Sequence, residues 1–291
     1  MSELSAERAP FGARLAAAMN EFGPLCVGID PHPGLLAAWG LSDDVAGLRT
    51  FALTVVDALG GKVAAFKPQS ALFERHGSRG MGVLEEVIAA SREAGTLSIV
   101  DAKRGDIGST MAGYADAFLA DGAPLAGDAL TVSPFLGFGS LTPAVELALE
   151  TGRGLFVLCL TSNPEGKEVQ HALAGELSVA ANIAASAGAL NAEAGSRGEL
   201  GSIGLVVGAT IGDAARSAGV DLETVNGAFL APGVGAQGAG ARELQEVFGA
   251  ARGGVLASSS RGVLKAGPSH EALLRAALEA ADEARLALRG N

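Results

Sequence analysis

The chain has 291 residues, of which 48% are hydrophobic and 18% are charged, and its formal net charge is −11 at pH 7. A general nucleic-acid binder would carry a basic stripe along the surface that faces the phosphates, and this acidic balance argues against that class. No apolar run approaches the roughly 18 residues that a membrane span requires, so we expect a soluble protein.

The N-terminal segment predicts an amphipathic helix over about residues 5–22. It lacks the basic region, apolar block and cleavage site of a secretory signal, so the expected compartment is the cytoplasm. The two cysteines, Cys26 and Cys159, each lie inside an apolar run and have no CxxC spacing. Their placement favours reduced thiols in the core over a disulfide or a zinc site.

Beyond this helix, short apolar runs recur, each followed by a loop and then by a segment in which apolar residues have helical spacing. Eight runs are candidate strands, at residues 24–30, 63–68, 97–103, 128–134, 154–160, 202–209, 228–233 and 254–260. Helices are expected over residues 42–60, 81–94, 109–121, 139–151, 167–192, 211–219 and 238–250, and over about 269–289 at the C-terminus.

Strands that are apolar almost throughout and alternate with helices indicate a parallel sheet covered by helices. Because eight such units close a barrel, the predicted fold is α/β, a single (β/α)8 TIM barrel that forms one domain over residues 1–291. The alternative is an open doubly wound sheet, in which a ligand would lie where the strand order reverses. No linker rich in proline or serine divides the chain.

Polar residues stand at several carboxyl ends of the predicted strands, where the active site of a barrel lies. These residues are Asp30, Lys67, Asp101, Lys103 and Ser162. Asp101 and Lys103 are two residues apart on one strand, so both side chains are expected on the same face, pointing into the mouth of the barrel.

The Asp-x-Lys pair by itself is equally consistent with an ion pair that closes the barrel and with a catalytic pair. Asp106 in the following loop and Lys67 on the preceding strand favour catalysis, because four charges from neighbouring strands would then meet. Only five of the 21 cations are lysines, yet lysine occupies both strand ends. Lysine, unlike arginine, can deliver a proton at modest energetic cost.

A glycine-rich segment, APGVGAQGAG at 231–240, contains a formal G-x-G-x-x-G pattern. A dinucleotide fingerprint would open the first βα unit and precede an acidic strand end, whereas this segment follows the seventh strand and the next strand ends in ASSSRG. Its position matches the phosphate site that barrels form after strands seven and eight, with Gln237 and Arg261 as candidate ligands. The four histidines lack the spacing of metal ligands, so no metal is expected.

Five segments, DAKRGDIGST, AFKPQSALFERHG, TSNPEG, APGVGAQG and SSSRG, together closely resemble the orotidine 5'-phosphate decarboxylase family, in particular its longer bacterial branch. The resemblance runs from about residue 22 to 265. Its most specific part is Asp-x-Lys-x-x-Asp followed four residues later by Thr, with a lysine on the preceding strand. The segment VGIDPHP also resembles the family's first strand, whose aspartate meets the nucleotide ribose.

The resemblance implies decarboxylation of orotidine 5'-phosphate to uridine 5'-phosphate, the last step of de novo pyrimidine synthesis, without a cofactor. Lys103 would protonate C6 of the pyrimidine, and Asp101 would lie against the substrate carboxylate. Lys67 would hold the charged array together and contact the ribose.

The resemblance also implies how the rest of the nucleotide is bound. Asp30 would bond the ribose, Ser162 the pyrimidine, and Gln237 with Arg261 the phosphate. Asp106 and Thr110 would reach into the partner's site, which implies a homodimer with shared active sites. No residue is assigned within about 166–200, the segment that the resemblance determines least.

Two other functions stay open on the sequence. A magnesium-dependent sugar-phosphate decarboxylase or lyase of the same superfamily shares Asp-x-Lys-x-x-Asp but works through a magnesium-bound enediolate. Lys67 speaks against it, because those relatives tend to carry a metal-binding carboxylate there. A catalytically silent phosphate-binding barrel that senses a nucleotide is the second alternative, and the intact charged array argues against it.

Overall fold

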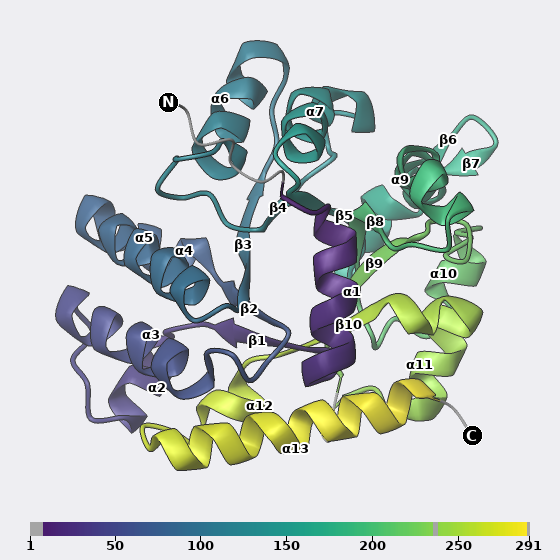
Figure 1. Cartoon of the computed structure of the whole chain (residues 1–291). Helices are drawn as coiled ribbons and strands as arrows, with labels where there is room; N and C mark the ends of the chain where they lie inside the picture. Colours follow the sequence, from purple (N-terminus) through teal and green to yellow (C-terminus); the bar gives the residue numbers. More distant parts are fainter. Residues whose placement is uncertain (1–7, 235–237, 290–291) are drawn as a thin grey trace.

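The computed structural model describes residues 8–234 and 238–289, and within them eight parallel strands close into a barrel in the order β1-β10-β9-β8-β5-β4-β3-β2 (Figure 1). The strands are β1 Leu25–Ile29, β2 Ala65–Pro68, β3 Leu97–Arg104, β4 Ala129–Val132, β5 Gly154–Leu160, β8 Gly201–Val207, β9 Gly227–Pro232 and β10 Val255–Ser259. Each lies within two residues of a predicted strand at both ends. The (β/α)8 prediction is confirmed, and closure excludes the open doubly wound sheet.

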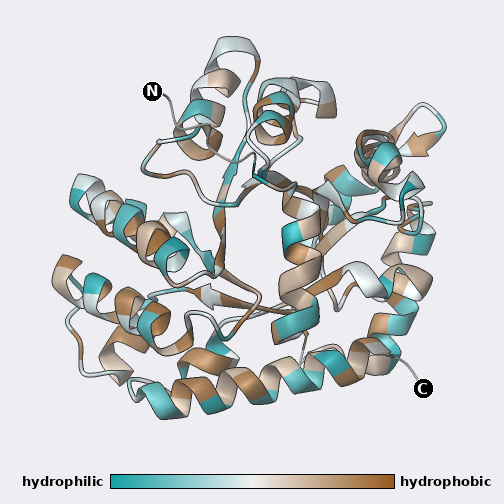
Figure 2. Cartoon of the chain, viewed as in Figure 1, coloured by the Kyte–Doolittle hydropathy of each residue, from teal (hydrophilic) through white to brown (hydrophobic). Residues whose placement is uncertain are grey.

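Helices surround the barrel, as Figure 1 shows. The longer ones are α3 Val45–Leu59, α5 Gly77–Glu93, α6 Gly108–Leu119, α7 Thr142–Glu150, α9 Val179–Ser196, α11 Ala241–Phe248 and α13 His270–Arg289. Short helices not expected from the sequence follow several strands: α2 Pro33–Ala38, α4 Ser70–Glu74 and α12 Arg261–Leu264. In Figure 2 hydrophilic and hydrophobic residues interchange along the outer helices, as in amphipathic helices that pack on a barrel.

Two parts of the helix prediction were wrong. The helix expected over 167–192 is interrupted: α8 Lys167–Gln170 is followed by a hairpin of β6 Leu173–Ala174 and β7 Leu177–Ser178 before α9 begins. Gly175 turns the hairpin at a φ of 74°, and the Ser178 hydroxyl accepts a hydrogen bond from the Ala181 amide at 3.0 Å, so it starts a new helix. The helix expected over 211–219 is the four-residue α10 Ala214–Ser217.

Two apolar layers hold the barrel. Alternate strand residues point inward and outward, so in β1 Cys26 belongs to the core inside the barrel, whereas Leu25 and Val27 pack toward the helices. Cys26 and Cys159 are both free and fully buried, as expected, and burial raises the pKa of each thiol to about 12. In the part of the chain that the structure covers, no helix is long and apolar enough to cross a membrane.

The helix α1 Phe11–Phe22 lies across the amino ends of the strands (Figure 1). It begins later than predicted, directly after Pro10, and residues 1–7 lie outside the described chain. Phe11 and Leu15 enter the core inside the barrel, where the Phe11 ring meets Phe156 edge-to-face at 5.9 Å. Gly154 leaves the space for that ring, because a Cβ there would lie 2.1 Å from it.

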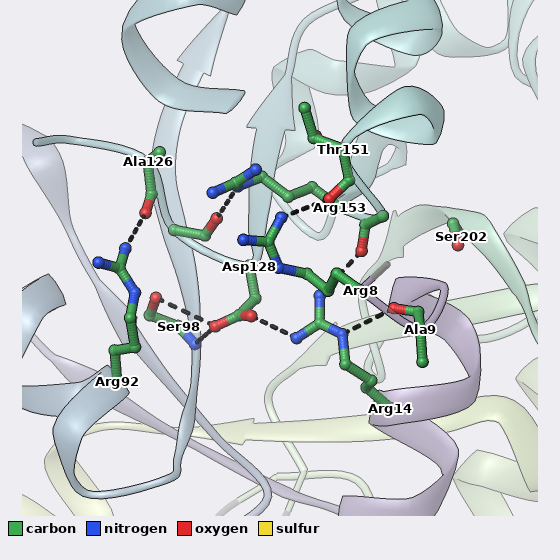
Figure 3. Close-up of polar contacts among 12 residues, drawn as sticks. Arg8, Ala9, Arg14, Arg92, Ser98, Ala126, Asp128, Thr151, Arg153 and Ser202 are labelled. Atoms are coloured by element: carbon green, nitrogen blue, oxygen red, sulfur yellow. Dashed lines mark hydrogen bonds and ion pairs between the residues drawn. The ribbon is translucent and has the colours of Figure 1, made fainter. Parts of the chain in front are cut away.

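A polar network fixes α1 to the loops that precede β4 and β5 (Figure 3). Asp128 accepts hydrogen bonds from the Arg14 guanidinium and, at 2.9 Å, from the Ser98 amide. Arg153 is 4% exposed and donates to the Gly127 carbonyl at 2.9 Å. This network closes the end of the barrel opposite the candidate site.

Candidate active site

A cavity of about 1390 Å³ opens at the carboxyl ends of the strands and extends along α13. Six of the predicted site residues line it: Asp30, Lys67, Asp101, Lys103, Ser162 and Arg261. The strand pattern explains why charge points inward here. Lys67 lies two residues after Ala65, and Asp101 two residues after Ile99, and both of these apolar residues belong to the core inside the barrel. The charged array therefore forms the top layer of that core.

The Asp101 carboxylate is the centre of the array and accepts four hydrogen bonds. Its Oδ2 accepts from Lys67 Nζ at 2.8 Å and from Gln69 Nε2 at 3.1 Å. Its Oδ1 accepts from Lys103 Nζ at 2.6 Å and from the Thr131 hydroxyl at 2.9 Å. Asp101 is only 6% exposed, so its orientation is fixed from four directions.

The ionisation of the array follows from these contacts. Burial alone would raise the pKa of Asp101, but the ammonium groups of Lys67 and Lys103 outweigh it and lower that pKa to about 2. Burial alone would lower the pKa of Lys67, but the charges of Asp101 and Asp30 outweigh it and hold that pKa above its usual range. At neutral pH Asp101 is therefore an anion and Lys67 a cation.

The two lysines differ in access. The Lys67 side chain is 8% exposed, whereas that of Lys103 is 45% exposed and extends along the cavity wall. Lys103 meets Asp101 as predicted, but not through regular strand alternation, because its φ of 48° is left-handed and the pairing of β3 with β4 shifts beside it. Of the two ammonium groups bound to Asp101, that of Lys103 is therefore the more accessible to a molecule in the cavity.

The rest of the cavity offers partners for a polar ligand. Within the described residues, Asp30 Oδ1 is buried and accepts no hydrogen bond. Arg261 begins α12, which is separated from the end of β10 by one residue, and both Arg261 and Lys265 line the wall. Ser162 follows β5 and lines the same cavity. The other predicted phosphate ligand, Gln237, lies outside the described residues.

Asp106 and Thr110 do not line the cavity of their own chain. The Asp106 carboxylate accepts a hydrogen bond from the Ile107 amide at 2.8 Å, and Thr110 is exposed near the start of α6. Ile107, Phe135 and Leu136 lie on the loops after β3 and β4, and they are 61%, 75% and 52% exposed. The loops after these two neighbouring strands therefore carry exposed apolar side chains, of which Ile107 is next to Asp106 in the chain.

Two partners of Asp101 escaped the sequence analysis, Gln69 and Thr131. Gln69 directly follows β2 and bridges to Asp101. Thr131 is a polar residue within the apolar run DALTVSP and is 1% exposed. A polar residue in a strand whose other residues are buried and apolar was the available signal, because a buried hydroxyl requires a hydrogen-bond partner.

The chain matches known proteins over almost its whole length. The model of the orotidine 5'-phosphate decarboxylase / HUMPS family matches residues 23–276. The orotidine 5'-phosphate decarboxylase of Streptomyces coelicolor is 60% identical over 282 residues, 96% of this chain and 98% of that protein. That of Salinispora arenicola is 57% identical over 282 residues, 97% of this chain and 99% of that protein.

Solved structures give the same result. The crystal structure of a protein from Streptomyces avermitilis, described as a putative orotidine 5'-phosphate decarboxylase, is similar at a TM-score of 0.93 and 58% identity, over 100% of both chains. The OMP decarboxylase of Leishmania donovani is similar at a TM-score of 0.71 and 28% identity, over 95% of this chain and 98% of that one. The similarity therefore extends over the whole barrel and over the segment 166–200.

Proposed function

The chain belongs to the orotidine 5'-phosphate decarboxylase / HUMPS family and decarboxylates orotidine 5'-phosphate to uridine 5'-phosphate, in pyrimidine biosynthesis, and we propose that Lys103 is the acid that protonates C6. One observation carries this proposal. Lys103 presents an ammonium group to the cavity 2.6 Å from Asp101 Oδ1, whereas the neighbouring Lys67 is buried.

The reaction explains the arrangement of charge. When the bond between C6 and the carboxylate breaks, CO2 leaves and the electron pair stays on C6, where no ring position delocalises it as an enolate would. An ammonium held beside that carbon stabilises the charge as it develops and then transfers a proton to it. The Lys103 amine left behind regains its proton from water. Asp101, placed against the substrate carboxylate, would disfavour the bound ground state.

The remaining contacts would bind the nucleotide away from the reacting carbon. The buried acceptor of Asp30 suits a ribose hydroxyl, and Lys67 lies beside it. Ser162 would bond the pyrimidine, and Arg261 with Gln237 the phosphate. Binding energy from the phosphate can hold the charged array in its reactive geometry although the phosphate takes no part in the chemistry.

We further propose a homodimer in which Asp106 and Thr110 complete the partner's site. Their positions outside the cavity of their own chain support this arrangement. The exposed Ile107, Phe135 and Leu136 supply apolar area for the contact.

We also propose that one domain spans the chain, in keeping with the continuous core. The proposed compartment is the cytoplasm, where the free thiols of a metabolic enzyme stay reduced.

The magnesium-dependent alternative is disfavoured by the contacts of Asp101. Each of its oxygens already accepts two hydrogen bonds, and one donor to each is an ammonium group. A cation in the same place would be repelled by Lys67 and Lys103. The relatives at 60% and 57% identity are also orotidine 5'-phosphate decarboxylases. The proposed reaction requires no cofactor.

The test is a turnover assay on orotidine 5'-phosphate in the presence of a chelator. Turnover is measured as the loss of orotate absorbance. Undiminished turnover is expected. Activity that disappears with chelator and returns with added magnesium would favour the magnesium-dependent alternative.

A further inference from the structure

The pairing of β3 with β4 is irregular at the charged array. Val100 pairs with Leu130, and the next pair is Arg104 with Val132. Three residues of β3, 101 to 103, therefore stand opposite one residue of β4, Thr131. This extra length lets the strand turn at Lys103, so that its ammonium returns to the Asp101 carboxylate.

The turn leaves the Lys103 amide without a carbonyl partner in the regular ladder, and the Thr131 hydroxyl takes that place. Thr131 Oγ1 accepts the Lys103 N–H at 3.0 Å and donates its own proton to Asp101 Oδ1 at 2.9 Å. One buried hydroxyl thereby joins the backbone of the proton donor to the carboxylate beside it. A hydroxyl can do both because it has one proton and two lone pairs.

Backbone strain adds to the need for this contact. The φ of Lys103 is 48°, in the left-handed region that a residue with a Cβ rarely adopts unless its surroundings enforce it. The next residue is held independently, since the Arg104 carbonyl accepts the Ser133 amide at 2.8 Å. Gly105 allows this close approach, because a Cβ there would lie 2.4 Å from the Ser133 carbonyl oxygen. Thr131 holds the turn on the side that faces Asp101, through its hydrogen bonds to the Lys103 amide and the Asp101 carboxylate.

We propose that Thr131 is a positioning residue for the decarboxylation, whose hydroxyl fixes the turn at Lys103 and the orientation of Asp101 so that ammonium and carboxylate meet the substrate in one geometry. The inference deepens the proposed function and rests on the role of Lys103 as the proton donor. Thr131 acts through these two residues and not by a contact of its own with the reacting carbon.

The test replaces Thr131 by Val, which keeps the shape and removes the hydroxyl, and by Ser, which restores the hydroxyl. We expect Thr131→Val to lower kcat and the single-turnover rate about 10- to 100-fold, because small displacements of reacting groups have effects of this size. Binding of uridine 5'-phosphate should stay within about twofold of wild type, since the ribose and phosphate contacts are untouched. Thr131→Ser should recover most of the rate.

A matched control separates positioning from stability. Thr96 is also buried, at 3% exposure, and its hydroxyl accepts the Gly61 N–H at 2.7 Å, but it precedes β3 at the opposite end of the barrel. Thr96→Val should lower the melting temperature without lowering kcat. If Thr131→Val does not fold, Thr131→Ser and Thr131→Ala differ only by the hydroxyl and give the same comparison.

Three outcomes would overturn the inference: a Thr131→Val rate within twofold of wild type, equal rates for the Ser and Ala variants, or an equal loss in Thr96→Val. Failure of the proposed function would look different. An inactive wild-type enzyme would contradict the reaction itself, and an active Lys103→Ala variant would contradict the proton donor, whatever Thr131 does.

Discussion

Replacing Asp101 by Asn tests whether the central carboxylate also stabilises the fold. The side chain keeps its shape but loses its charge, and Lys67 stays buried with the weaker attraction of Asp30. The native pKa of about 2 lies nearly two pH units below the value of about 3.9 for an unperturbed aspartate, and each unit corresponds to about 1.4 kcal/mol. We therefore expect Asp101→Asn to lower the free energy of unfolding by about 2–3 kcal/mol at pH 7.

The pH dependence has a definite sign. Because folding lowers the pKa of Asp101, its stabilisation is complete above about pH 4 and is lost as the pH falls through 2. The difference between wild type and Asp101→Asn should therefore shrink at the acid end of a pH series.

Urea unfolding at one fixed protein concentration measures this difference. The single tryptophan, Trp39, is 7% exposed and provides the fluorescence signal. Asp116→Asn, an exposed aspartate of α6, is the control and should change the free energy of unfolding by no more than about 0.5 kcal/mol. Equal stability of Asp101→Asn and wild type at pH 7, or a difference that stays constant toward pH 3, would show that the charge of Asp101 does not stabilise the fold.

Three further predictions concern the phosphate, the dimer and the closed end of the barrel. Arg261→Ala should lower kcat/KM by about 100-fold or more, because a charge-assisted contact to the phosphate is lost; a value near wild type in steady-state kinetics would refute that assignment. Ile107→Asp, at a side chain 61% exposed, should yield monomers with low activity; an intact, active dimer in light scattering would place the interface elsewhere. Phe11→Ala should lower the free energy of unfolding by about 3–5 kcal/mol in urea titrations, since the ring is 1% exposed. A loss below 1 kcal/mol would show that α1 does not close the barrel core.

The barrel was predictable from the sequence because its strands are short, apolar almost throughout and regularly spaced. The site was predictable where a charge interrupts such a strand near its end, as at Lys67 and Asp101. A buried charge there requires partners, and parallel strands in a barrel bring their carboxyl ends together. Local pattern was sufficient for these residues.

What could not be predicted depends on pairing between strands. The roles of Gln69 and Thr131 arise from the register of β2, β3 and β4, and the left-handed turn at Lys103 exists because β3 has extra residues opposite Thr131. No spacing within one strand encodes that register. The prediction of one helix over 167–192 was also wrong. The alanine-rich pattern around Gly175 favours a helix, whereas the glycine itself turns a hairpin.

The role of Lys103 as the acid that protonates C6 is tested by a comparison of wild type with Lys103→Ala. Enzyme in excess is mixed with orotidine 5'-phosphate, the orotate absorbance is followed, and binding of uridine 5'-phosphate is measured by calorimetry on the same samples. We expect Lys103→Ala to bind uridine 5'-phosphate measurably and to leave the orotate absorbance unchanged. Decarboxylation retained in that variant would show that Lys103 is not the proton donor.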